Sequence, residues 1–201
     1  QRRSVLPAPP EGAANLVAYN HWSYTHHEMT EEALLREIDA AAELGAEVFT
    51  VDAGWYGDKG RSWAGGLGAW RPGSRLPNGL RPIREHAHRR GLRFGLWVWI
   101  EAASLDGPVI REHPDWLLRR DGEPLDNQLD LTKPEVAAWV ESEIVRIVEE
   151  YGIDLFRLDY NARPGEGGYN VRGGFDENTI WRHYEARSEE RRVGKECCTP
   201  C

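Results

Sequence analysis

The stretch "IDLFRLDYN", residues 153–161, decides how this chain is interpreted. It is an apolar run of strand length that ends on a carboxylate, Asp159, with Asn161 two places further on. A continuous apolar run of roughly four to eight residues is typical of a strand that is covered on both faces. The terminal Asp has two explanations: a loop residue bonded to nearby backbone N–H groups, or a catalytic carboxylate.

The same order, a buried strand followed by a helix, occurs four times along the chain. The helix that begins after Thr30 has Glu31 and Glu32 in its first turn and Gly45 at its end, which are typical helix boundaries. Strands are predicted from the start of 15–24 and over 47–52, 92–99 and 153–159, and helices over 31–44, 80–91, 134–151 and 175–186. For the helix over 134–151, Thr132 is the predicted cap. The stretches 53–79 and 100–131 are predicted to be irregular.

Strands without polar alternation indicate a parallel sheet with helices on its faces. Because the carboxyl ends of such strands meet at one edge, the side chains that follow them are candidates for a site. No G-x-G-x-x-G turn or P-loop follows a predicted strand, which disfavours a nucleotide-binding sheet. Polar or aromatic side chains end four strands in succession: Asn20, His21, Trp22, Asp52, Trp55, Trp97, Trp99, Glu101, Asp159 and Asn161. This coincidence favours the catalytic explanation for Asp159.

The composition, 40% hydrophobic and 29% charged over 201 residues, is that of a globular domain. The net charge of −8 argues against a nucleic-acid partner, and no apolar run approaches the roughly 20 residues that cross a bilayer. No signal peptide is recognised, so we expect a cytoplasmic protein without a membrane partner. Nine Trp residues suit stacking on sugar rings, although Trp is equally ordinary core material. All three Cys lie within 197–201, which excludes a Cys-based zinc site in the body of the chain.

Seven short segments together resemble glycoside hydrolase family 36, the α-galactosidases and their relatives. They cover roughly residues 15–186, and their joint order is more specific than any one of them. The segments are "YNHW" (19–22), "VDAGWYG" (51–57), "LPNGLRPI" (76–83), "GLRFGLW" (91–97), "EHPDWLL" (112–118), "NQLDLTKPEV" (127–136) and "YGIDLFRLDYN" (151–161). The resemblance implies an α/β fold, a partial TIM (β/α)8 barrel with roughly its first four βα units.

The resemblance also implies a retaining double displacement, with Asp159 as the catalytic nucleophile. Such chemistry needs a second carboxyl about 5–5.5 Å away as acid and base, and the family's residue for that role would lie beyond Ala186. The implied substrate-binding residues are Asp52, Trp55, Trp97, Trp99, Glu101, Arg157 and Asn161. Arg157 is expected to keep Asp159 ionised, Asp52 to bind sugar hydroxyls, and the three Trp residues to supply a stacking wall.

The chain departs from the family pattern at three strand ends. Where the family usually has Asp-Asp-Gly-Trp, this chain has Asp52-Ala53-Gly54-Trp55. Where the family usually has Lys-Trp-Asp-Met-Asn, residues 157–161 of this chain begin with Arg157. Of the usual Glu-Pro-Glu, only the second acid remains, as Glu101. We expect an α-galactosidase. The alternatives are an α-N-acetylgalactosaminidase or other α-glycosidase of the same superfamily, and a non-catalytic carbohydrate-binding remnant. No cofactor and no metal are expected. The expected partner is an oligosaccharide or glycoside, with a homo-oligomer for the full-length protein.

Three parts are expected along the chain. Residues 1–14 are a Pro- and Ala-containing linker after a missing N-terminal region, and residues 15–186 are the N-terminal half of a catalytic barrel. The segment "RSEERRVGKEC" (187–197) resembles the translation of a common DNA-sequencing adapter, so 187–201 is expected to be a non-native tail. We expect residues 1–201 alone, as a fragment without the acid/base residue, to be inactive.

Overall fold

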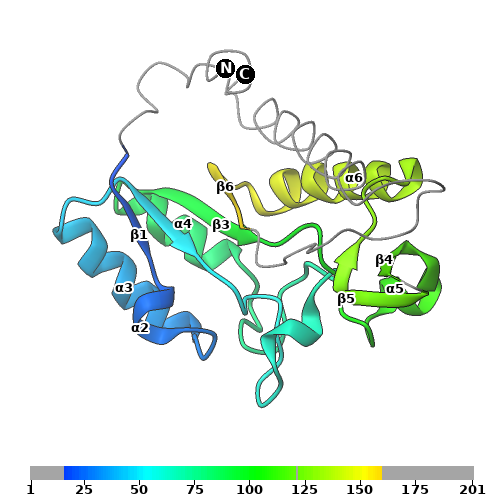
Figure 1. The fold of residues 1–201 in the computed structure, drawn as a ribbon. Helices are drawn as coiled ribbons and strands as arrows, with labels where there is room; N and C mark the ends of the chain where they lie inside the picture. Colours follow the sequence, from blue (N-terminus) through cyan, green and yellow to red (C-terminus); the bar gives the residue numbers. More distant parts are fainter. Residues whose placement is uncertain (1–15, 121, 160–201) are drawn as a thin grey trace, which may run out of the picture.

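The computed structural model describes residues 16–120 and 122–159 (Figure 1). Their centre is a four-stranded parallel sheet in the order β1-β2-β3-β6. The strands are β1 (Ala18–Asn20), β2 (Val48–Val51), β3 (Arg93–Val98) and β6 (Leu155–Leu158). This confirms the predicted parallel sheet. The expected linker, the helix over 175–186, the tail and Asn161 lie outside the described residues.

Three longer helices alternate with these strands (Figure 1). They are α3 (Glu31–Glu43), α4 (Arg81–Arg89) and α6 (Pro134–Tyr151). A short helix, α2 (Trp22–Thr25), also follows β1 directly. Each of the three longer helices buries an apolar stripe, and full burial of one such Leu or Ile contributes roughly 1.5–3 kcal/mol relative to an exposed side chain. The fully buried side chains include Leu34 and Ile38 of α3, Ile83 of α4, and Ile147 of α6.

The observed helix ends confirm some of the predicted boundary residues and contradict one. Thr30 caps α3, because its Oγ1 accepts a hydrogen bond from the Ala33 N–H at 3.2 Å. Gly152 ends α6 in the left-handed conformation, with φ of 58°. The predicted cap of α6 is wrong: Lys133 occupies the cap position without a side-chain bond, while the Thr132 hydroxyl donates to Asp130 Oδ1 at 2.6 Å. Thr132 is therefore used by a turn that precedes the helix.

The segment between β3 and α6 was predicted to be irregular, and the structure corrects this. It contains α5 (Pro108–Glu112), the 3-10 turn η2 (Pro114–Trp116) and an antiparallel hairpin of β4 (Leu117–Arg120) and β5 (Glu123–Leu129). Figure 1 shows this unit to one side of the parallel sheet. Most of β5 is only partly covered, so its sequence lacks the continuous apolar run that revealed the other strands. The first long loop, 53–79, contains only the 3-10 turn η1 (Trp63–Gly66).

The sheet interior is closely packed. All of β2 is buried, and a Cβ on Gly95 of β3 would lie 2.7 Å from Thr50 Oγ1 on β2. Gly95 is therefore required by the close approach of neighbouring strands. Within the described residues, no helix is both long and apolar enough to span a membrane.

Candidate functional site

Polar side chains of β1, β2 and β6 meet at the carboxyl edge of the parallel sheet. Asn20 is the last residue of β1, Asp52 directly follows β2, and Asp159 directly follows β6. Arg157 lies within β6, paired in register with Trp97 of β3. The structure thus brings together Asp52, Trp97, Arg157 and Asp159, four of the predicted site residues.

Asp52 is held by three donors from three parts of the chain. Its Oδ2 accepts from Asn20 Nδ2 at 2.5 Å and from Arg157 Nη1 at 2.5 Å, and its Oδ1 accepts from the Ala53 N–H at 2.7 Å. The Asp52 side chain is only 8% exposed, whereas that of Arg157 is 41% exposed. Charge-assisted bonds of this kind are stronger than neutral ones and fix the carboxylate plane. The site therefore presents Asp52 in one orientation, with the Arg157 guanidinium beside it at the surface.

The sequence predicts an effect of the Arg157 charge on Asp159, and the structure adds an ion pair between Arg157 and Asp52. The reason is the sheet geometry. Asp52 follows β2 and Arg157 lies on β6, with β3 between them, so the long Arg157 side chain spans one strand to make a contact between residues 105 positions apart. The expected effect of Arg157 on the ionisation of Asp159 stays a prediction.

His21 holds the Asp52 backbone through a hydrogen bond. Its side chain is fully buried, its Nδ1 accepts from the Asp52 N–H at 2.9 Å, and its Nε2 lies 3.0 Å from the His26 carbonyl oxygen. Burial lowers the pKa of His21 from its ordinary value. The neutral imidazole with its proton on Nε2 satisfies both contacts. The sequence pattern placed Asn20 and His21 at strand ends without a role, because their contacts with Asp52 join residues more than 30 positions apart.

Asp159 is oriented by an indole. Trp97 Nε1 donates to Asp159 Oδ2 at 2.9 Å, and the Asp159 N–H donates to the Val98 carbonyl at 3.2 Å. Trp97 is in turn held by Trp55, whose Nε1 donates to the Trp97 carbonyl at 2.9 Å. Because an indole N–H can only donate, this contact fixes one carboxylate oxygen of Asp159 against Trp97. Two buried Trp side chains therefore position the candidate nucleophile.

The predicted stacking wall is largely covered. Trp55 and Trp97 are 0% and 1% exposed, and Trp99 is 5% exposed. The Trp55 ring packs against other buried rings, with centroids 5.2 Å from Tyr56 and 5.6 Å from Tyr151. The described structure thus places Trp55 in the core beneath the site. Sugar stacking by the three Trp residues stays a prediction.

Glu101 is also buried, at the point where the parallel sheet meets the hairpin. Its carbonyl accepts from the Leu129 N–H at 2.8 Å and from Gln128 Nε2 at 3.2 Å. The backbone of Glu101 therefore connects the end of β3 to β5, and the predicted contact of its carboxylate with a sugar stays a prediction. Among residues 16–120 and 122–159, no three His, Cys, Asp or Glu side chains gather as a metal site would require.

Comparison with known proteins identifies this arrangement. The Melibiase family profile matches residues 6–184. The α-galactosidase Mel36A of Lactobacillus acidophilus is 34% identical over 151 residues, which are 72% of this chain and 20% of that protein. An Escherichia coli α-galactosidase is 30% identical over 177 residues, which are 85% of this chain and 25% of that protein. The chain therefore spans about a fifth to a quarter of the length of these relatives.

Solved structures agree with the sequence match. The family 36 α-galactosidase AgaA of Geobacillus stearothermophilus superimposes with a TM-score of 0.78 and 28% identity, covering 90% of this chain and 26% of that one. An α-galactosidase of Thermus thermophilus superimposes with a TM-score of 0.73 at 27% identity, covering 90% of this chain and 36% of that one. The parallel sheet is thus part of a TIM barrel, as predicted. On its sequence, its sheet and its strand-end residues, the chain belongs to the Melibiase family, with the glycoside hydrolase family 36 α-galactosidases as relatives.

Proposed function

We propose that the full-length protein is a retaining α-glycosidase that hydrolyses terminal α-galactosides through Asp159. The observation that carries this proposal is the hydrogen bond from Trp97 to Asp159 beside the Asp52–Arg157 pair, at the carboxyl edge of a barrel sheet. Relatives of this chain are named α-galactosidases, and variants of the Geobacillus enzyme have been solved with raffinose and with stachyose. These names support the reaction class and the type of sugar linkage.

In the proposed first step, an oxygen of the Asp159 carboxylate attacks the anomeric carbon and the glycosidic bond breaks. A second carboxyl, supplied by a segment other than the described residues, protonates the departing oxygen. In the second step the same group takes a proton from water, which then attacks the glycosyl ester and restores Asp159. Trp97 contributes by fixing the plane of the attacking carboxylate before the sugar binds.

Asp52 and its neighbours are proposed to bind the sugar in the first subsite. The Asp52 carboxylate accepts hydrogen bonds from sugar hydroxyls, and the half-exposed Arg157 guanidinium offers donors to them. Asn20 and Arg157 already fix the orientation of the Asp52 side chain. Asp52 therefore loses no further conformational freedom when a sugar binds. Glu101, Trp99 and Asn161 remain proposed members of the same subsite.

The test of the nucleophile is Asp159→Asn in the full-length protein, assayed on p-nitrophenyl α-galactoside. We expect kcat to fall by at least about a thousandfold, because loss of a nucleophile removes the covalent route. The matched control is Asp154→Asn, at the opposite end of the same strand, where the carboxylate accepts from the Phe94 N–H. That variant should retain turnover. Wild-type turnover by Asp159→Asn would exclude the mechanism.

Two further measurements separate the alternatives. Proton NMR of the first-formed sugar should show the α anomer, since two displacements return the starting configuration. A panel of aryl α-galactoside, α-N-acetylgalactosaminide and α-glucoside should give the highest kcat/KM for the galactoside. The panel matters because Ala53, which is buried, stands where the family usually has a second Asp. Sugar binding without any turnover would instead indicate a carbohydrate-binding remnant.

A further inference from the structure

The loop over 53–79 is a fixed structure around the site. Its two halves are joined by hydrogen bonds from the Gly73 N–H to the Trp55 carbonyl at 3.1 Å and from the Ser74 N–H to Asp58 Oδ1 at 3.0 Å. Arg75, which is 2% exposed, donates through Nη2 to the Arg61 carbonyl at 2.9 Å. A buried Arg therefore holds the backbone just before η1.

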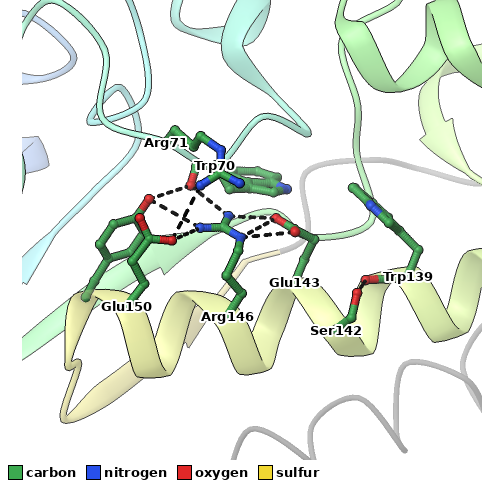
Figure 2. Close-up of polar contacts among 8 residues, drawn as sticks. Trp70, Arg71, Trp139, Ser142, Glu143, Arg146 and Glu150 are labelled. Atoms are coloured by element: carbon green, nitrogen blue, oxygen red, sulfur yellow. Dashed lines mark hydrogen bonds and ion pairs between the residues drawn. The ribbon is translucent and has the colours of Figure 1, made fainter.

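The loop over 53–79 is also hydrogen-bonded to α6. Figure 2 shows Arg146 between Glu143 and Glu150, with its guanidinium directed at the Trp70 carbonyl. Arg146 Nη2 and the Tyr151 hydroxyl both donate to that carbonyl at 3.0 Å. The loop is thus anchored on both sides of η1, and a side chain presented by η1 has a defined position.

Trp63 is the side chain that η1 presents toward the site. Ser62 caps this turn, accepting from the Ala64 N–H at 3.3 Å. The Trp63 ring is half-buried, 5.9 Å from the Trp97 ring at 85° and 6.4 Å from the Trp22 ring at 81°. In neither of these two contacts do the indole rings stack face to face. Since Trp97 donates to Asp159, Trp63 lies one aromatic ring away from the candidate nucleophile.

We infer that Trp63 binds the leaving-group side of the substrate, the sugar residue next to the terminal galactosyl unit. This inference rests on the proposed function. The galactosyl ring must place its anomeric carbon at Asp159, so an aromatic ring beyond Trp97 is positioned for the next ring along. A partly exposed indole on an anchored turn offers an apolar face to a pyranose at a small entropic cost. Trp55 and Trp97 are 0% and 1% exposed, so neither offers this next ring an exposed face.

The test compares two substrates of the full-length protein, raffinose and α-galactosyl fluoride. Both contain the same galactosyl unit, but fluoride has no ring to contact Trp63. We expect Trp63→Ala to lower the ratio of kcat/KM for raffinose to kcat/KM for the fluoride by about tenfold, and Trp63→Phe by about threefold. The control is Trp139→Ala, a partly buried Trp that packs on Trp116 of η2. That variant should keep the wild-type ratio.

Each other outcome has a definite meaning. An unchanged ratio for Trp63→Ala, or an equal loss on both substrates, overturns the inference, the second because it indicates that Trp63 only supports Trp97. If the alanine variant is insoluble, Trp63→Leu keeps apolar bulk without an aromatic face and should show the same tenfold fall. If the wild-type protein cleaves neither substrate, the proposed function fails and the inference fails with it.

Discussion

His21 shows how a buried residue outside the chemistry can control the geometry of the site. Its imidazole accepts a hydrogen bond from the Asp52 backbone N–H, which requires an unprotonated Nδ1. Protonation would place two N–H groups against each other, inside a region where the side chain has no exposure. The lowered pKa of His21 follows from this burial. The neutral ring is thus part of the framework that orients Asp52.

This pKa shift predicts a pH dependence of stability. In the unfolded chain His21 titrates near its ordinary pKa of about 6.5. Between that value and the lower folded pKa, the unfolded state binds a proton that the folded state does not. The contribution of His21 to stability is therefore complete above pH 6.5 and is lost as the pH falls below it. Thermal midpoints of the full-length protein should show this loss of stability. His21→Gln, whose amide carries an acceptor and a donor but does not titrate, should reduce the loss.

The control for this experiment is His113→Gln. His113 stacks on Trp116, with ring centroids 4.0 Å apart, and takes no part in the Asp52 contacts. Its variant should keep the wild-type loss of stability below pH 6.5. If His21→Gln shows the same pH dependence as the wild type, the loss comes from other groups.

At the scale of elements, the long loop after β2 depends on α6 for its shape. Trp70 has a φ of 45°, in the left-handed region that non-glycine residues rarely occupy. Such a conformation costs of order 1–3 kcal/mol and persists only when its surroundings fix it. Here the Trp70 side chain is fully buried, and its carbonyl accepts from Arg146 and Tyr151 of α6 (Figure 2). The helix therefore stabilises a loop conformation that the loop sequence alone disfavours.

Tyr151→Phe tests this dependence. The substitution removes one of the two donors to the Trp70 carbonyl, and we expect a loss of about 1 kcal/mol in the free energy of unfolding. Loop cleavage in limited proteolysis should become faster. The control is Arg71→Met, which breaks the exposed Arg71–Glu150 pair of 3.4 Å and should change stability by less than about 0.5 kcal/mol. Equal effects of the two variants would mean that the Trp70 carbonyl is not the anchor.

The elements also show what sequence patterns can predict. Continuous apolar runs and the signals at Thr30 and Gly152 identified the parallel strands and the main helices, because these features are local. The hairpin of β4 and β5 was missed, since β5 is largely polar and only partly covered, and the apolar part of β4 is only Leu117 and Leu118. At the site, Asp52 and Asp159 followed from strand ends. Their contacts did not: the hydrogen bonds to Arg157 and Trp97 join residues 105 and 62 positions apart, which only the folded sheet brings together.

At the scale of the whole molecule, the described residues form an open sheet. Within them, β1 and β6 each pair with one neighbour only, because they stand at the two ends of the order β1-β2-β3-β6. A barrel removes such edges by closing the sheet, and closure also covers the apolar face that points to its interior. In the relatives the matching segment is about a fifth to a quarter of the chain. We therefore expect folding and activity to depend on parts of the protein beyond these 201 residues.

Residues 1–201 produced alone should consequently self-associate and lack activity. Within the described residues, β1 and β6 each have one edge without a partner strand, and these edges can be satisfied by pairing with a second copy. Size-exclusion chromatography with light scattering should show oligomers or aggregates, and no turnover of p-nitrophenyl α-galactoside should be detected. The full-length protein, measured in parallel, should cleave this substrate. A monodisperse, active monomer of residues 1–201 would show that this segment carries a complete catalytic pair and that closure of the barrel is not required.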